Sequence, residues 1–91
     1  MAYRIEVPKR ATRALERLAA ASHRDYLRID DAIRALAANP RPNGCKKLRG
    51  RGPLFRIKVG DYRVIYAVFD PDRLVKIEEV SRRNTNSYKE R

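Results

Sequence analysis

Apolar residues in the first forty positions follow one strand-like pattern and then two helix-like patterns. Residues 3–7 alternate apolar and charged side chains, which suits a half-buried strand. Two apolar stripes at helical spacing follow. They predict one helix from Pro8 to about Ala21 and a second that ends near Ala38. Ser22 and Asp25, between the two stripes, have the spacing of a helix capping box. The pattern therefore predicts a helix hairpin suited to covering one face of a sheet.

The pattern changes to a period of two in the second half of the chain. Residues 41–53 contain three glycines and two prolines, which predicts a loop. Gly60 and Asp61 are typical of a tight turn, and residues 70–73 form a second turn signal. Three strands are predicted, over residues 54–59, 62–69 and 74–80.

These elements predict an α+β fold. The expected order is β-α-α-β-β-β, with a two-helix hairpin packed on one face of a small, mostly antiparallel four-stranded sheet. The polar tail, residues 81–91, has room for one short terminal helix. A length of 91 residues predicts a single domain that spans residues 1–91. One sheet face would then be left open to a ligand.

Charge indicates what that ligand is. Lys and Arg total 22 against 11 Asp and Glu, which gives a formal net charge of +11. Residues 41–66 hold eight basic residues and one acid, and residues 82–91 hold four basic residues and one acid. A segregated excess of this kind favours a polyanion such as RNA, although a merely solvated surface is the simpler alternative. The residues expected to bind RNA outside the catalytic positions are Lys46, Lys47, Arg49, Arg51 and Arg82.

The scarcity of cysteine and histidine argues against several functional classes. The single cysteine, Cys45, cannot form an internal disulfide, and the single histidine, His23, leaves no metal-ligand cluster and no partner for a cysteine nucleophile. No stretch approaches the roughly 20 apolar residues of a membrane span. The N-terminal residues enter a strand pattern and lack the apolar core of a signal peptide, so we expect a cytoplasmic protein that does not contact a membrane.

The candidate catalytic residues lie on the predicted strands. Arg56 and Lys58 share one strand face because side chains two apart project the same way. If the hairpin register brings Arg63 near Lys58, three cations converge, and they could stabilise the pentacoordinate transition state of phosphodiester cleavage. A lysine among arginines can also give up its proton more readily and serve as a general base. The alternative is that these residues simply line the solvent face of an amphipathic strand.

The tail offers further candidates. Arg82, Arg83 and Tyr88 follow the last predicted strand closely and could fold back onto the same sheet face. Tyr88 could stack on an RNA base, or it could pack a tail helix against the domain.

Four parts of the chain carry a resemblance to a known family. They are residues 47–50 (Lys-Leu-Arg-Gly), residues 54–66, residues 80–83 (Val-Ser-Arg-Arg) and the late Tyr88. Together they resemble the RelE/ParE toxin superfamily over nearly the whole chain. The block strand-Gly-Asp-Tyr-Arg-strand-Tyr within residues 54–66 is the most specific part. The likeness to RelE implies the toxin of a type II toxin-antitoxin system. It would be a ribosome-dependent endoribonuclease that cleaves mRNA in the A site by 2′-hydroxyl attack and so inhibits translation.

The resemblance also implies a role for each residue. Lys58 would be the general base, Arg56 and Arg63 would stabilise the phosphorane, Arg83 would support the leaving 5′-oxygen, and Tyr88 would stack on or orient the substrate. No metal and no cofactor would be needed. The chain departs from RelE in having Arg56 where RelE carries a lysine, and an arginine can stabilise phosphate but cannot donate a proton. The spacing from Arg83 to Tyr88 is also one residue shorter than in RelE, so Arg82 is the alternative match.

Partners follow from the same resemblance. We expect a cognate antitoxin protein, a toxin-antitoxin hetero-oligomer, and contact with the ribosome and mRNA. ParE-type relatives share the fold but inhibit DNA gyrase by binding, without nuclease activity, and this is the principal alternative. A nucleic-acid-binding module without activity is a third reading, suggested by charge alone.

Overall fold

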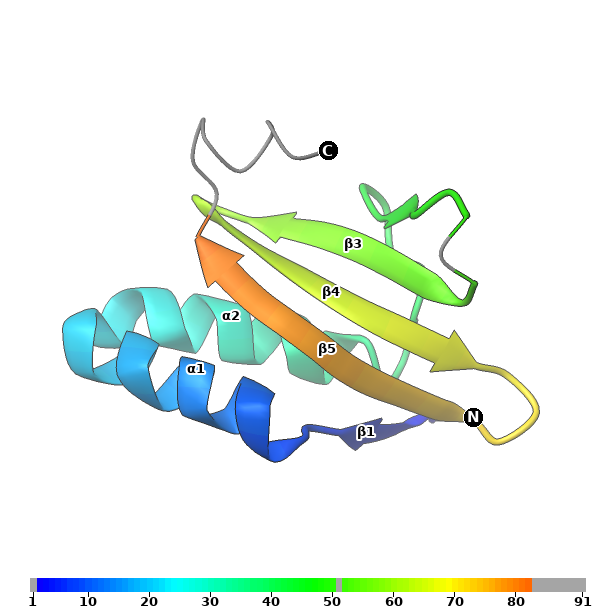
Figure 1. The fold of residues 1–91 in the computed structure, drawn as a ribbon, viewed down its shortest axis with the longest axis horizontal. Coiled ribbons are helices and arrows are strands. Elements are labelled where there is room, and N and C mark those ends of the chain that lie inside the picture. The colour runs from blue at the N-terminus through cyan, green and yellow to red at the C-terminus, as the bar shows by residue number, and fades with distance from the viewer. Residues whose placement is uncertain (1, 51, 83–91) are drawn as a thin grey trace.

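The computed structural model describes residues 2–50 and 52–82, which form two helices and five strands (Figure 1). The elements are β1 (Arg4–Glu6), α1 (Lys9–Ala21), α2 (His23–Ala35), β2 (Lys46–Lys47), β3 (Leu54–Val59), β4 (Tyr62–Phe69) and β5 (Leu74–Arg82). The strands form one sheet in the order β1-β5-β4-β3-β2. Both helices lie on the same side of this sheet, as Figure 1 shows, and the α+β prediction is confirmed.

The sheet has five strands, so the prediction of four was wrong by one. The extra strand is β2, which lies inside the segment predicted as a loop and pairs antiparallel with β3. It has only two residues, too few for any periodicity to be visible in the sequence. The first strand, β1, pairs in parallel with β5, and the other pairings are antiparallel. The tail helix considered above falls outside the described residues.

One residue both ends the first helix and begins the second. The Ser22 backbone N–H donates to the Leu18 carbonyl, and the Ser22 hydroxyl accepts a hydrogen bond from the Asp25 backbone N–H at 3.3 Å. The Ser22 half of the predicted capping box is therefore confirmed, and the two helices form a tight hairpin. The second helix ends at Ala35, three residues before the predicted end at Ala38, and a turn replaces its last part.

The core lies between the helix hairpin and the inner face of the sheet. Its buried residues on the helices and the following turn are Ala11, Leu18, Ile29, Ile33 and Leu36, and those on the strands include Ile57, Val64, Tyr66, Val68, Val75 and Ile77. The buried Tyr66 hydroxyl donates to the Pro40 carbonyl at 2.8 Å. Burial raises the pKa of Tyr66, so this phenol keeps its proton and remains a donor. In the described part of the chain, neither helix is long and apolar enough to cross a membrane.

A second set of contacts anchors the chain where strands β4 and β5 are joined. The Asp70 carboxylate accepts hydrogen bonds from the Tyr3 hydroxyl at 2.7 Å and from the Arg41 guanidinium at 2.8 Å. The Arg41 guanidinium also lies 5.3 Å from the centre of the Phe55 ring. These contacts hold the start of residues 41–66, which we call the basic segment, against the sheet. Arg41 therefore has a structural role.

Candidate functional site

The strand alternation predicted for the basic residues is confirmed by burial. Ile57 of β3 is buried in the core, and Phe55 and Val59 pack against it. Arg56 and Lys58, which alternate with these residues, therefore project from the opposite face. Neither α1 nor α2 lies on that face (Figure 1), and we call it the open face.

The register of the sheet brings four cations together on the open face. Lys58 of β3 lies directly opposite Arg63 of β4, on either side of the turn at Gly60. Gly60 has φ +60, a left-handed conformation that glycine adopts without strain, and this turn sets the pairing. Lys46 of β2 lies opposite Arg56 on the other side of β3. We call Lys46, Arg56, Lys58 and Arg63 the cationic cluster.

Among residues 2–50 and 52–82, no acidic side chain forms an ion pair with the cluster. The Nε atoms of Arg56 and Arg63 are buried and have no hydrogen-bond partner in the structure. The ion pairs found among residues 2–50 and 52–82 involve other arginines, namely Arg28, Arg34 and Arg41. Like charges directly opposite each other on adjacent strands are destabilising. An arrangement with unmatched donors and repelling charges is suited to receive an anion such as a phosphodiester.

The neighbours of the cluster along the sheet are apolar or uncharged, with one exception. Ile65 of β4 lies opposite Arg56, and Ser81 of β5 lies opposite Arg63. The exception is Glu79 of β5, the partner of Ile65 on its other side. Sequence reasoning missed Glu79, because simple alternation along β5 places it on the helix-covered face.

The structure does not bring all the predicted RNA-binding residues together. Lys47 is the register partner of Phe55, so it alternates away from Lys46 and from the open face. Arg82 pairs with Tyr62, and its guanidinium lies 5.9 Å from the centre of that ring. Arg49 is exposed in the turn after β2. Three predicted site residues lie outside the described residues: Arg51, Arg83 and Tyr88.

The chemistry available at this surface is electrostatic. In the described part of the chain, no three side chains of His, Cys, Asp or Glu gather in a way that could hold a metal ion. The residues present can bind a phosphodiester through charge-assisted hydrogen bonds.

These features define a class: a small basic α+β protein with a helix hairpin on one sheet face and a cationic cluster on the other. Residues 5–86 match the family model described as the ParE toxin of type II toxin-antitoxin systems, parDE, so the chain belongs to the RelE/ParE superfamily of type II toxins. A Methanocaldococcus jannaschii protein named RelE1 is 30% identical over 98% of each chain.

Solved structures place the chain with RelE-type toxins. RelE in the archaeal RelE-RelB complex from Pyrococcus horikoshii is 36% identical, with a TM-score of 0.72, and the match covers 93% of this chain and 99% of that one. A chain of the toxin-antitoxin complex RelBE2 from Mycobacterium tuberculosis is 25% identical, with a TM-score of 0.77 over 91% of this chain and 93% of that one. The resemblance inferred from the sequence is confirmed.

Proposed function

We propose that this toxin is a metal-independent, ribosome-dependent endoribonuclease that cleaves mRNA in the A site. The observation that carries the proposal is the direct cross-strand pairing of Lys58 with Arg63 on the open face, with Arg56 beside them. The relatives named RelE support the same activity.

The proposed reaction is an internal transfer. Lys58, as the general base, takes the proton from a 2′-hydroxyl, whose oxygen attacks the adjacent phosphorus. Arg56 and Arg63 stabilise the extra negative charge of the phosphorane. The bond from phosphorus to the 5′-oxygen then breaks, and that oxygen takes up a proton from water to leave as a 5′-hydroxyl. The other product carries a 2′,3′-cyclic phosphate, and within this proposal Arg83 supports the leaving oxygen while Tyr88 orients the substrate.

The proposal is tested by mapping cuts in a defined transcript during in vitro translation. The wild-type toxin should cut ribosome-bound mRNA, leave free mRNA intact, and produce cyclic phosphate ends. Lys58→Ala or Arg63→Ala should each lower the single-turnover rate by about 100-fold or more, because general-base and electrostatic contributions have that size. Arg13→Ala is the matched control, because Arg13 is an exposed cation of α1 away from the open face. Cleavage unchanged in both cluster variants would overturn the proposed site.

Gyrase inhibition is a second candidate function, and the description of the matching family model favours it. This function would require the toxin to bind DNA gyrase without nuclease activity. A toxin that inhibits DNA supercoiling by gyrase while ribosome-bound transcripts stay intact would establish this function and exclude the nuclease.

We also propose that a cognate antitoxin binds this chain as a hetero-oligomer and suppresses it. RelE of Pyrococcus horikoshii forms a complex with RelB, and the RelBE2 structure is likewise a toxin-antitoxin complex. Cleavage that persists at full rate with the antitoxin in molar excess would refute this mode of control.

A further inference from the structure

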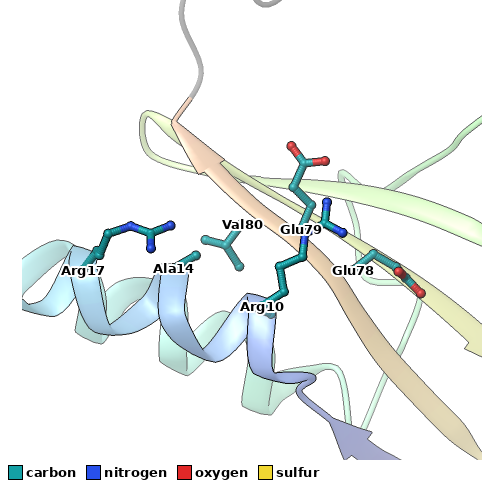
Figure 2. A pocket seen from close by; sticks show the side chains of 7 residues that line it. Arg10, Ala14, Arg17, Glu78, Glu79 and Val80 are labelled. Carbon is teal, nitrogen blue, oxygen red and sulfur yellow. The ribbon is translucent and has the colours of Figure 1, made fainter.

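A carboxylate lies beside the cationic cluster on the open face. Glu79 of β5 is the register partner of Ile65, and Ile65 is in turn the register partner of Arg56. The next pair of β4 and β5 on the open face is Arg63 with Ser81. Glu79 is exposed, and Figure 2 shows its carboxylate turned away from α1. Neighbouring strands are about 4.8 Å apart and alternate residues about 7 Å apart, so these positions cover roughly 10 by 7 Å.

A β-bulge places Glu79 on this face. Val75 and Ile77 are buried, and continued alternation would turn Glu79 inward as well. Instead the register shifts: Tyr66 pairs with Ile77, Ile65 pairs with Glu79, and Glu78 has no partner across the strand. Beyond this point the side chains of β5 alternate regularly again, with Glu79 and Ser81 on the open face and Val80 on the helix-covered face. Bulges are common beside active sites, where they re-aim a side chain.

Because of the bulge, an apolar residue still occupies the next core position of β5. Val80 lies opposite the buried Val64 and packs against the core. On the helix side, the same stretch of β5 and residues of α1 line a small cavity of about 130 Å³, with Arg10 reaching toward the bulge (Figure 2). Both Glu78 and Glu79 line this cavity, but Glu78 is half-buried and has no cross-strand partner, whereas Glu79 is exposed and pairs with Ile65.

Neutralisation of the cluster does not explain the Glu79 carboxylate. No ion pair within residues 2–50 and 52–82 includes Glu79, although Arg63 is only one diagonal position away. A carboxylate repels phosphate, so it does not assist backbone binding directly. It accepts hydrogen bonds only, and the donors that RNA offers are the 2′-hydroxyl and the amino and imino groups of its bases; only the base groups differ from one nucleotide to the next. The apolar side chain of Ile65, between Arg56 and Glu79, gives a base a surface to lie against.

We propose that Glu79 is a specificity-determining residue that reads the base of a nucleotide bound on the cationic cluster. It accepts hydrogen bonds from the amino group on the Watson–Crick edge and so favours guanine, cytosine or adenine over uracil. Uracil has no amino group: its Watson–Crick edge presents a single N3–H between two carbonyl oxygens, and those oxygens repel a carboxylate. This inference rests on the proposed mRNA cleavage and adds the source of its base preference.

The test compares Glu79→Gln with Glu78→Gln, which makes the same change in charge one residue away. Ribosome-bound transcripts would carry uracil in turn at each position of the A-site codon. We expect the wild-type rate to fall about 10- to 100-fold with uracil at one position. The glutamine amide both donates and accepts, so Glu79→Gln should remove most of that difference, whereas Glu78→Gln should retain it. Glu79→Asp keeps the carboxylate and should retain the preference in part.

The outcomes separate this inference from the function on which it rests. Wild-type cleavage with no discrimination against uracil at any position would overturn the inference and leave the nuclease in place. A Glu79→Gln variant that changes the rate equally for all codons would also overturn it, since that result indicates only a general electrostatic effect. A wild-type toxin that cuts no transcript would overturn the proposed function and, with it, the base-reading role.

Discussion

The pairing of Lys58 with Arg63 predicts that the toxin gains stability when its site is neutralised. Side chains that face each other on paired strands start about 5 Å apart, and two unit charges at that separation repel by about 0.8 kcal/mol in water. Both side chains are long and partly exposed, which keeps the effect near that value rather than above it. Lys58→Gln and Arg63→Gln should therefore each raise the free energy of unfolding by about 0.5–1 kcal/mol. For a chain of this length, a gain of about 1 kcal/mol raises Tm by roughly 4–8 °C.

A double-mutant cycle measured by urea unfolding tests this expectation at low salt. The double variant should fall short of the sum of the two single gains by about 0.5–1 kcal/mol, because the same repulsion is removed only once. The shortfall should shrink in 1 M salt, where the screening length is about 3 Å. A cycle of Lys58→Gln with Arg13→Gln, on the exposed side of α1, should be additive and controls for net charge. Additivity in the Lys58–Arg63 cycle at low salt would refute the reasoning.

Two further predictions concern the contacts that hold the basic segment. Tyr66→Phe removes the donor to the buried Pro40 carbonyl and should lower the free energy of unfolding by about 1–3 kcal/mol, measured by urea unfolding; an unchanged midpoint would contradict the role of this bond. The Tyr3 hydroxyl and then Arg41 lower the pKa of Asp70, so its contribution to stability is present above pH 4 and is lost as the pH falls through the folded-state value. Asp70→Asn should therefore lower Tm at pH 7 and flatten its acid dependence, and a parallel Tm–pH profile for both proteins would contradict this.

Local patterns in the sequence predicted the parts of the fold that depend on near neighbours. The helix hairpin follows from apolar spacing and the Ser22 cap, and both are present. Three members of the cationic cluster were predictable because Arg56 and Lys58 are two apart and Gly60 marks a tight turn that fixes the register to Arg63, whereas the place of Lys46 opposite Arg56 depends on β2, which was not predicted. In each case the deciding interaction spans only a few residues of chain.

Features that depend on distant segments were not predictable in the same way. The parallel pairing of β1 with β5 joins residues about seventy positions apart, and no local pattern signals it. The bond from Tyr3 to Asp70 has the same origin. The bulge at Glu78 is hidden for a different reason, because two consecutive glutamates give no sign of which one faces the open side.

The bulge also has a consequence for how the strand tolerates changes in length. Glu78 occupies no rung of the β4–β5 ladder, so its deletion would let Ile77 and Glu79 follow one another in ordinary alternation. Val80 would stay inside, and Glu79 and Ser81 would stay outside. A homologue shorter by one residue at this point could therefore keep the same catalytic surface, and an alignment of such homologues should open its gap there.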